Sequence, residues 1–289
     1  PPPPYLRSMS LYIASLNSGS NANCYYAGNE TEAVLIDAGL SCRETERRMK
    51  QLGLPMEKIK AIFVTHEHAD HISGVAGLSR KFRLPVYITE ATLSSSGLSI
   101  EAELVRSFQH NKAIAIGALS VLPFRKHHDG ADPHSFTVSH RGVHVAVITD
   151  IGFACKQVIK QFSRCHAAFL ESNYCEEMLE KGSYPYPLKR RISGDEGHLS
   201  NRQALELFQH YRSDALRLLI LSHLSKNNNK PELVESLFAP HAGTAQVYVA
   251  SRYTVSPVFY VEAGTTMPPA AKSTTKGRRV KNENQLSLF

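Results

Sequence analysis

Four potential metal ligands lie within six positions of one short segment of the chain. The segment, Thr65 to Gly74, is T-H-E-H-A-D-H-I-S-G, and its ligand types are His66, His68, Asp70 and His71. It follows the apolar residues 61–64, which have strand character. Alternation along an extended chain places His66 and His68 on one side. Asp70 and His71 would turn into the following segment, so one loop can supply two metal ions.

The side-chain types of this segment indicate which metals would bind. Imidazole pairs with a carboxylate suit Zn, Mn or Fe, and the absence of cysteine argues against a purely structural zinc site. An exposed polar loop is the alternative interpretation. The H-x-H-x-D-H spacing directly behind an apolar strand argues against that alternative. The segment therefore predicts a catalytic metal site.

The segment resembles the signature of the metallo-β-lactamase superfamily, which has further polar residues at strand ends. Such residues are present in the expected order: Asp37 after the apolar run 33–36, His128 after 121–124, Asp150 after 143–149 and His223 after 218–222. Taken singly, each could be an ordinary polar residue at the end of a strand. Their joint order is the observation on which the resemblance depends.

This resemblance implies two divalent metal ions per chain, Zn or Mn, with Fe or Ni as alternatives. One metal would be held by His66, His68 and His128, the other by Asp70, His71 and His223, with Asp150 between them. Asp37 would orient these ligands from behind, and Asp37, Asp70 and Asp150 would take part in catalysis. His127 competes with His128, and Asp129 directly after His128 favours His128.

Several longer segments resemble a narrower group, the YycJ/WalJ bacterial metallo-hydrolases. They are S-L-N-S-G-S-N-A-N from Ser15, F-L-E-S-N-Y-C-E-E-M-L from Phe169, G-S-Y-P-Y-P-L-K-R-R-I from Gly182, G-H-L-S-N from Gly197 and L-S-H-L-S-K-N-N-N-K-P-E from Leu221. The resemblance covers residues 9–262 and implies 5′-to-3′ exonuclease activity on DNA. His134 departs from it, because a small or apolar residue is expected there. The 72 residues between Asp150 and His223 are too few for the cap domain of the larger β-CASP nucleases.

The segment between Gly182 and Asn201 independently suggests a phosphate-bearing polymer as substrate. Its candidate substrate contacts are Tyr184, Lys189, Arg190, Arg191, Ser200 and Asn201. Cations contact backbone phosphates, and aromatic rings such as those of Tyr184 and Tyr186 stack on unpaired bases. A solvated loop with tyrosines packed on the core is the alternative. By resemblance, His198 faces the cleft and binds the scissile phosphate or protonates the leaving oxygen; a structural histidine is the other interpretation.

The pattern of elements predicts an α/β fold, specifically an αβ/βα four-layer sandwich, as one domain over residues 9–266. Strands are expected at 11–16, 24–27, 33–37, 86–89 and within 102–149, and helices at 43–52, 72–82, 157–162, 176–181 and 201–211. Gln203, three residues after Ser200, indicates a capping box. A chain of 289 residues that is 42% hydrophobic can bury a large core.

Composition also bears on the cellular compartment. No apolar run approaches the ~20 residues of a membrane span. The five cysteines are scattered and lack a C-x-x-C pair, which indicates free thiols in a reducing compartment. No secretory signal pattern is visible, so we expect a cytoplasmic, nucleoid-associated protein without a membrane partner. The pattern does not indicate an oligomeric state.

Residues 267–289 form a basic tail with no apolar periodicity. From residue 270 on, five Lys and Arg residues against one Glu contribute +4 of the net charge of +7. The chain then ends in Gln285, Leu286, Ser287, Leu288 and Phe289. Exposed apolar side chains gain nothing without a partner. These five residues resemble the pentapeptide with which bacterial repair proteins bind the DNA polymerase sliding clamp; a tail that folds back on its own domain, or chance, is the alternative.

Together these patterns predict a dinuclear metal-dependent DNA exonuclease linked to replication or mismatch repair. A hydrolase of small phosphodiesters or thioesters would explain the metals but not the tail. A ribonuclease of the same fold is a further alternative, because nothing in the sequence reads a 2′-hydroxyl. A non-catalytic clamp-bound adaptor would require degenerate metal ligands, and every expected ligand is present.

Overall fold

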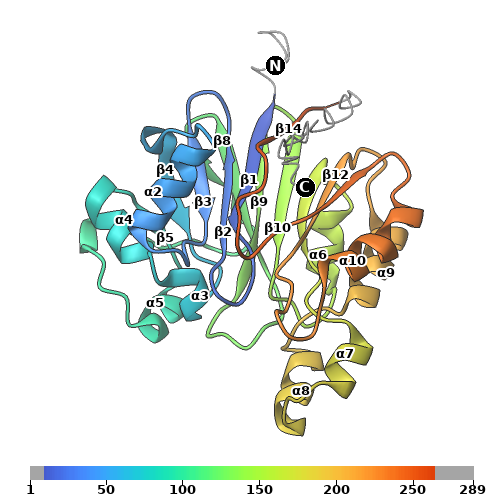
Figure 1. Ribbon diagram of the computed structural model, residues 1–289. Coiled ribbons are helices and arrows are strands. Elements are labelled where there is room, and N and C mark those ends of the chain that lie inside the picture. The colour runs from blue at the N-terminus through green and yellow to red at the C-terminus, as the bar shows by residue number, and fades with distance from the viewer. Residues whose placement is uncertain (1–9, 264–289) are drawn as a thin grey trace, which may run out of the picture.

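Two seven-stranded mixed sheets form the centre of the molecule in the computed structural model, which describes residues 10–263 (Figure 1). The first sheet has the order β14 (Phe259–Val261), β1 (Leu11–Asn17), β2 (Cys24–Gly28), β3 (Ala33–Ile36), β4 (Ile59–Phe63), β5 (Val86–Tyr87) and β6 (Val105–Arg106). The second has the order β13 (Gln246–Val249), β12 (Leu218–Ser222), β11 (Ala167–Glu171), β10 (Val143–Ile148), β9 (His134–His140), β8 (Leu119–Arg125) and β7 (Ile114–Ile116). Residues 267–289 of the predicted tail lie outside the described part.

Helices cover the outer face of each sheet. The first sheet is covered by α2 (Cys42–Gln51), α4 (Val75–Phe82) and α5 (Glu90–Ser96), and the second by α6 (Lys156–Phe162), α9 (Asn201–Tyr211) and α10 (Pro231–Phe238). Three more short helices, α3 (Ala69–Ile72), α7 (Glu176–Lys181) and α8 (Tyr186–Ser193), lie at one end of the sheets. The predicted four-layer sandwich is therefore confirmed.

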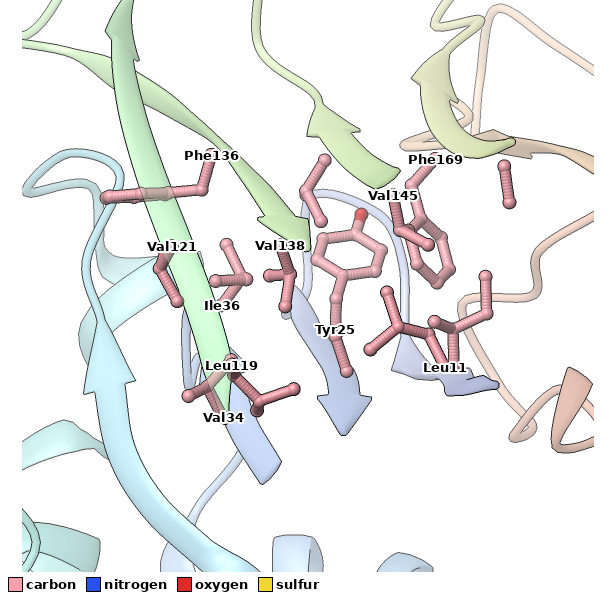
Figure 2. Close-up of a cluster of buried hydrophobic side chains, with 14 of the residues drawn as sticks. Leu11, Tyr25, Val34, Ile36, Leu119, Val121, Phe136, Val138, Val145 and Phe169 are labelled. Atoms are coloured by element: carbon pink, nitrogen blue, oxygen red, sulfur yellow. The ribbon is translucent and has the colours of Figure 1, made fainter. Parts of the chain in front are cut away.

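The central core lies between the two sheets (Figure 2). Val34 and Ile36 of the first sheet face Val121, Val138 and Val145 of the second, and all are fully or almost fully buried. The central strands β11 and β12 are buried on both faces, as the continuous apolar runs of parallel strands require. This rigid core fixes the strand ends to which the site residues are attached.

Two helices near the site begin and end at places with clear local causes. In α9, the Ser200 side chain accepts from the Gln203 backbone while the Gln203 side chain accepts from Ser200, which confirms the predicted capping box. The predicted start of the helix over 72–82 is wrong, because α3 ends before Gly74 and α4 begins after it. A Cβ at Gly74 would lie 1.8 Å from the Leu40 carbonyl oxygen, so only glycine permits this close approach.

The segment between Gly182 and Asn201, for which no helix was predicted, contains one. Helix α8 begins after Pro185 and has a second proline in its first turn, a position that needs no backbone N–H. None of its residues is buried. In Figure 1, α7 and α8 project together from the end of the second sheet.

Candidate active site

Three of the predicted site residues leave their strands through the same unusual backbone conformation. Asp37, Asp150 and His223 follow β3, β10 and β12, and their φ angles are 59°, 55° and 57°. Left-handed backbone is unfavourable for residues other than glycine and concentrates at functional sites. β3 and β4 are parallel, as are β10 and β12 through β11, so these turns bring side chains from both sheets to one edge.

The first cluster of metal-ligand types consists of His66, His68 and His128, whose candidate ligand atoms lie within 4.8 Å of one another. His66 Nε2 and His68 Nδ1 are 3.0 Å apart. The Nδ1 of His128 donates to the Gly197 carbonyl at 3.0 Å, which leaves Nε2 as the nitrogen with a free lone pair. The loop after β4 and the segment after β8 therefore present three imidazoles to one point.

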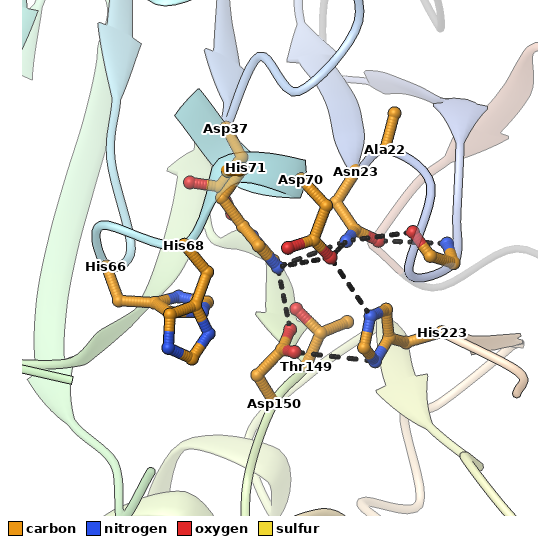
Figure 3. A network of polar contacts seen from close by, with 12 residues as sticks. Ala22, Asn23, Asp37, His66, His68, Asp70, His71, Thr149, Asp150 and His223 are labelled. Atoms are coloured by element: carbon orange, nitrogen blue, oxygen red, sulfur yellow. Dashed lines mark hydrogen bonds and ion pairs between the residues drawn. The ribbon is translucent and has the colours of Figure 1, made fainter. Parts of the chain in front are cut away.

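The second cluster is made by Asp70, His71 and His223, again within 4.8 Å (Figure 3). His223 Nε2 lies 3.6 Å from Asp70 Oδ2. Asp150 lies between the two clusters: its Oδ2 is 3.3 Å from His71 Nε2 and its Oδ1 is 3.9 Å from His128 Nε2. The two clusters thus meet at one carboxylate.

Several of these atoms are buried without a hydrogen-bond partner. They are His128 Nε2, His223 Nε2 and Asp150 Oδ2. Buried polar atoms normally have partners, so such a group of atoms aimed at one another needs an explanation. Imidazole nitrogens and carboxylate oxygens are the ligands that Zn, Mn and Fe accept. The side chains present fit two divalent metal ions.

Ionisation of the first cluster favours metal binding. Burial lowers the pKa of His66 well below its usual value and that of His128 to about 4, so both imidazoles are neutral near pH 7. In the second cluster, burial alone would lower the pKa of His71 and His223. Asp150 and Asp70, together with Asp37 beside His71 and Glu171 beside His223, outweigh burial and raise both pKa values, that of His223 to about 10. Because of these raised pKa values, His71 and His223 are protonated near pH 7 when no metal is bound.

Asp37 lies directly behind the second cluster. Its carboxylate is fully buried and accepts hydrogen bonds from the Thr65 backbone N–H at 2.8 Å and the Thr65 hydroxyl at 2.8 Å. Its Oδ2 is also 2.6 Å from His71 Nδ1. These contacts fix the His71 ring with Nε2 facing Asp150.

Asn23 supports the same cluster and was not singled out from the sequence. Its amide nitrogen donates to Asp70 Oδ2 at 3.0 Å and lies 3.1 Å from His71 Nε2. Its backbone N–H donates to the Asp70 carbonyl at 2.7 Å. Its position in the S-N-A-N motif was the signal available in the sequence.

Glu171 is the second residue that sequence reasoning missed. This fully buried carboxylate ends β11 and accepts from the backbone of Ile151 at 2.8 Å. It lies 2.7 Å from His198 Nδ1 and 3.1 Å from His223 Nδ1. Burial alone would raise the pKa of Glu171, but its contacts with His198 and His223 together outweigh burial and lower that pKa to about 2. Glu171 therefore joins the second metal cluster to His198.

Lys126 adds a buried positive charge under the site. Its side chain is almost fully buried, and its Nζ donates to the Thr149 carbonyl at 2.9 Å. Burial lowers its pKa. A cation here partly offsets the charge of the surrounding carboxylates.

The clusters open into a cleft of about 400 Å³. His68, His128, Asp150 and His223 line its metal side, and Tyr184, Leu188, Arg191, Ile192 and His198 line the rest together with neighbouring residues. Positions 188, 191 and 192 are the cleft-facing side of α8. Arg191 Nε donates to Asp129 Oδ2 at 2.6 Å, and Asp129 Oδ1 lies 3.2 Å from His128 Nε2. This contact links α8 to the first cluster.

The other predicted substrate contacts lie elsewhere. Lys189 donates to the Glu180 carbonyl at 2.6 Å, and neither it nor Arg190 lines the cleft. Ser200 and Asn201 are buried: Ser200 caps α9, and Asn201 is bonded to Ser172 and Asn229. The structure gives Ser200 and Asn201 contacts that hold the fold rather than contacts to a ligand.

Two histidines left open by the sequence are also placed. His127 is exposed and packs on the Phe153 ring at 4.5 Å, away from the cluster that contains His128. His134 is buried, donates through Nδ1 to the Asp132 carbonyl at 2.9 Å, and packs edge-on against Phe108. Neither is part of the metal-ligand groups found among residues 10–263.

Within the same residues, no helix has the length and apolar character needed to cross a membrane.

Comparison with known proteins gives a consistent result. Residues 18–223 match the model of the Metallo-beta-lactamase superfamily. The chain is 36% identical to exodeoxyribonuclease YycJ of Bacillus anthracis over 228 residues, which is 78% of this chain and 86% of that protein. It is 29% identical to exodeoxyribonuclease WalJ of Streptococcus pneumoniae strain D39, over 83% of this chain and 91% of that protein. Its fold is similar to that of Zn²⁺-bound PqqB from Methylobacterium extorquens, with a TM-score of 0.65, 14% identity, and 87% and 99% of the two chains covered.

Proposed function

The chain belongs to the metallo-beta-lactamase superfamily, within the YycJ/WalJ group, and from that membership we propose that it is a dinuclear DNA exonuclease that acts in replication or mismatch repair. It is a metal-dependent hydrolase of nucleic acids. The observation that carries the finer proposal is that two clusters of metal-ligand side chains, some of whose atoms have no hydrogen-bond partner, meet at Asp150. Asp150 lines a cleft whose wall also contains the positively charged Arg191.

In this proposal the ligand sets follow the two clusters. His66, His68 and His128 hold one metal, Asp70, His71 and His223 hold the other, and Asp150 contributes to both. When bound, a pair of Zn or Mn ions supplies Lewis acidity and lowers the pKa of water. Asp37 keeps the lone pair of His71 directed into the site through its hydrogen bond to Nδ1.

His198 is placed to move a proton at the leaving oxygen. Its Nδ1 is held at 2.7 Å by Glu171, and the residue lines the cleft, so the opposite ring nitrogen is available to substrate. A general acid must stand within hydrogen-bond reach of the oxygen that it protonates. Glu171 would stabilise the protonated imidazole and fix its orientation, which makes Glu171 a positioning residue.

Arg191 is the cation of the cleft wall that can meet a backbone phosphate. Its guanidinium contacts the Asp129 carboxylate, but the Arg191 side chain is 62% exposed, so it can also reach a phosphate oxygen in the cleft. Tyr184 lines the same wall, and its hydroxyl accepts from Asn227 at 2.9 Å. Of the residues predicted to contact substrate, we retain these two.

The terminal residues Gln285 to Phe289 lie outside the described residues, and we propose that they bind the bacterial sliding clamp. This proposal fits the position of β14, the last strand of the described residues, which lies away from the cleft. Val261 of β14 pairs with Leu11 at the start of β1, whereas the end of β1 leads to Ser18, which accepts from the His223 backbone at 2.7 Å. Figure 1 shows β14 at the end of the sheets opposite α8. A partner bound through the residues that follow β14 need not cover the cleft. This role would place the protein in the cytoplasm at the nucleoid.

The proposed activity is tested with DNA labelled at either the 5′ or the 3′ end, together with RNA of the same sequence. Purified protein is chelated and then supplied with Mn, Zn or Mg. We expect stepwise loss of nucleotides from the 5′ end of DNA. Release from RNA alone, or cleavage of small phosphodiesters alone, would contradict the proposal.

The clamp proposal has its own test. A peptide of the last five residues should bind purified clamp in the micromolar range, about −8 kcal/mol. Changing Leu288 and Phe289 to Ala should remove binding of the full chain in a pull-down, with the rate on naked DNA unchanged. Absence of binding at high micromolar peptide would exclude recruitment through this motif.

A further inference from the structure

A second cleft, of about 270 Å³, adjoins the first. Ser225 lines both clefts, so the two are neighbours at this residue. Ser18 lines the second cleft and accepts a hydrogen bond from the His223 backbone at 2.7 Å. The second cleft therefore lies directly beside the second metal cluster. Its volume is near the lower bound of about 300 Å³ for small-molecule sites, which is suitable for one nucleotide rather than a large ligand.

The floor and the rim of this cleft differ in character. Leu224, Val249 and Ala250 are apolar lining residues, and the rim contains Lys226 and Arg252. Glu235 is the carboxylate among the lining residues of this cleft, so the two cations exceed the acidic charge by one. Lys226 is exposed and has no ion pair within residues 10–263.

Tyr253 gives the rim an exposed aromatic ring on a fixed piece of backbone. The residue is 66% exposed. Its carbonyl accepts from Arg48 at 3.2 Å, and its N–H donates to the Ser251 hydroxyl at 3.0 Å. An aromatic face held in this way can stack on a base of any sequence.

We propose that the second cleft binds one nucleotide of the substrate strand next to the scissile phosphate, with Tyr253 stacked on its base and Lys226 against its phosphate. The inference rests on the proposed function, because it takes the first cleft as the site of phosphodiester hydrolysis. The position beside the first cleft at Ser225, the excess of cations and the exposed ring all favour a single nucleic-acid strand over a protein segment. This subsite extends the binding surface from the α8 wall of the first cleft past Ser225 to Tyr253.

The stacking is tested with single-stranded DNA that carries 2-aminopurine at successive positions from the 5′ end. The wild-type protein is loaded with metal, and the DNA carries phosphorothioate linkages that resist cleavage. Binding should quench the 2-aminopurine fluorescence at one position more than at its neighbours. Tyr253→Ala should remove that quenching and weaken binding between about 5-fold and about 150-fold, the range for one base-stacking aromatic. Tyr253→Phe should retain both. Tyr211→Ala removes another exposed tyrosine, on α9, and should have no effect.

The phosphate contact is tested by the salt dependence of binding. Lys226→Ala should reduce the slope of log affinity against log salt by about 0.7, the value for one phosphate of a single strand. Lys160→Ala, an exposed lysine of α6, serves as the matched control and should leave the slope unchanged.

Hydrolysis of bis(p-nitrophenyl) phosphate separates this inference from the proposed function. The Tyr253 and Lys226 variants should cleave this small ester at the wild-type rate. Wild-type affinity for DNA in both variants, or equal losses on DNA and on the small ester, would overturn the subsite. Failure of the wild-type protein to cleave DNA would instead overturn the proposed function.

Discussion

Replacing Asp37 with Asn should weaken metal binding at the Asp70, His71 and His223 position by about 10- to 100-fold, the usual effect of removing the group that orients a ligand. In energy this is about 1.4 to 2.8 kcal/mol. Asn is nearly the same size as Asp and tolerates the left-handed conformation, φ 59°, that Asp37 adopts. The change therefore alters hydrogen bonding with little effect on packing or backbone strain.

The expected loss of metal affinity follows from the direction of three hydrogen bonds to the Asp37 carboxylate. Asp37 Oδ1 accepts from the Thr65 N–H, while Oδ2 accepts from the Thr65 hydroxyl and His71 Nδ1. An Asn side chain can keep its oxygen toward the Thr65 N–H only by placing its NH₂ group against His71 Nδ1. That arrangement forces Nδ1 to accept and moves the ring proton to Nε2, the nitrogen that faces Asp150. A protonated Nε2 cannot bind a metal.

The assay is a competition titration with a chromophoric chelator, followed by elemental analysis after dialysis. The Asp37→Asn protein should lose metal from one position and retain it at the three-histidine position, giving about one metal per chain where wild type should hold two. Asp214→Asn, at an exposed aspartate, is the matched control. Two tightly held metals in Asp37→Asn, with wild-type affinity, would refute the orientation argument.

Three further predictions concern the acid, the cleft wall and pH. His198→Gln should slow DNA hydrolysis by about 100- to 10,000-fold but barely affect bis(p-nitrophenyl) phosphate, whose leaving group needs no acid; equal losses on both substrates would contradict the acid role. Arg191→Ala should weaken DNA binding and reduce its salt dependence more than Arg190→Ala does, as measured by fluorescence anisotropy, because Arg191 alone of the two lines the cleft. In chelated protein, burial would lower the pKa of His223, but Asp150, Asp70 and Glu171 together raise it from 6.5 to about 10. The stability contributed by its charge is therefore complete below pH 6.5 and disappears as the pH rises toward 10. The melting temperature of chelated wild type should therefore fall over this range more than that of His223→Gln, and parallel curves would contradict the assigned charge.

The metal clusters were predictable because their information is local. Four ligand types lie in one loop, and the others directly follow apolar runs that form strands. Parallel strands within one sheet bring such residues to a common edge, so the order of strand ends was enough to anticipate the cluster. The four-layer fold followed from the same alternation of strands and helices.

Contacts between distant segments were not predictable in this way. Glu171 meets His198 and His223, 27 and 52 residues further along the chain, and no spacing in the sequence marks those contacts. Ser200 and Asn201 belong to a motif near the cleft, yet their side chains turn inward to cap and brace α9. Orientation of this kind depends on tertiary packing.

A short helix and a cleft formed by distant segments were also not predicted from the sequence. Helix α8 has eight residues, two prolines nearby and no buried side, so it lacks the apolar periodicity that identifies a helix. Its helical turn determines that Arg191 faces the cleft while Arg190 does not. The second cleft, formed by segments around residues 18, 225 and 252, was likewise invisible before the chain was folded.

The central claim is that the protein hydrolyses DNA with two metals held by these clusters. A titration of activity against added metal tests this claim most directly. Chelated protein is given increasing equivalents of Mn or Zn, and nucleotide release from end-labelled DNA is measured at each step. The rate should rise to a plateau at two equivalents per chain and remain at background for His66→Ala/His68→Ala and for Asp150→Ala, with both variants still folded. Full activity of either variant, or of metal-free wild type, would contradict the claim.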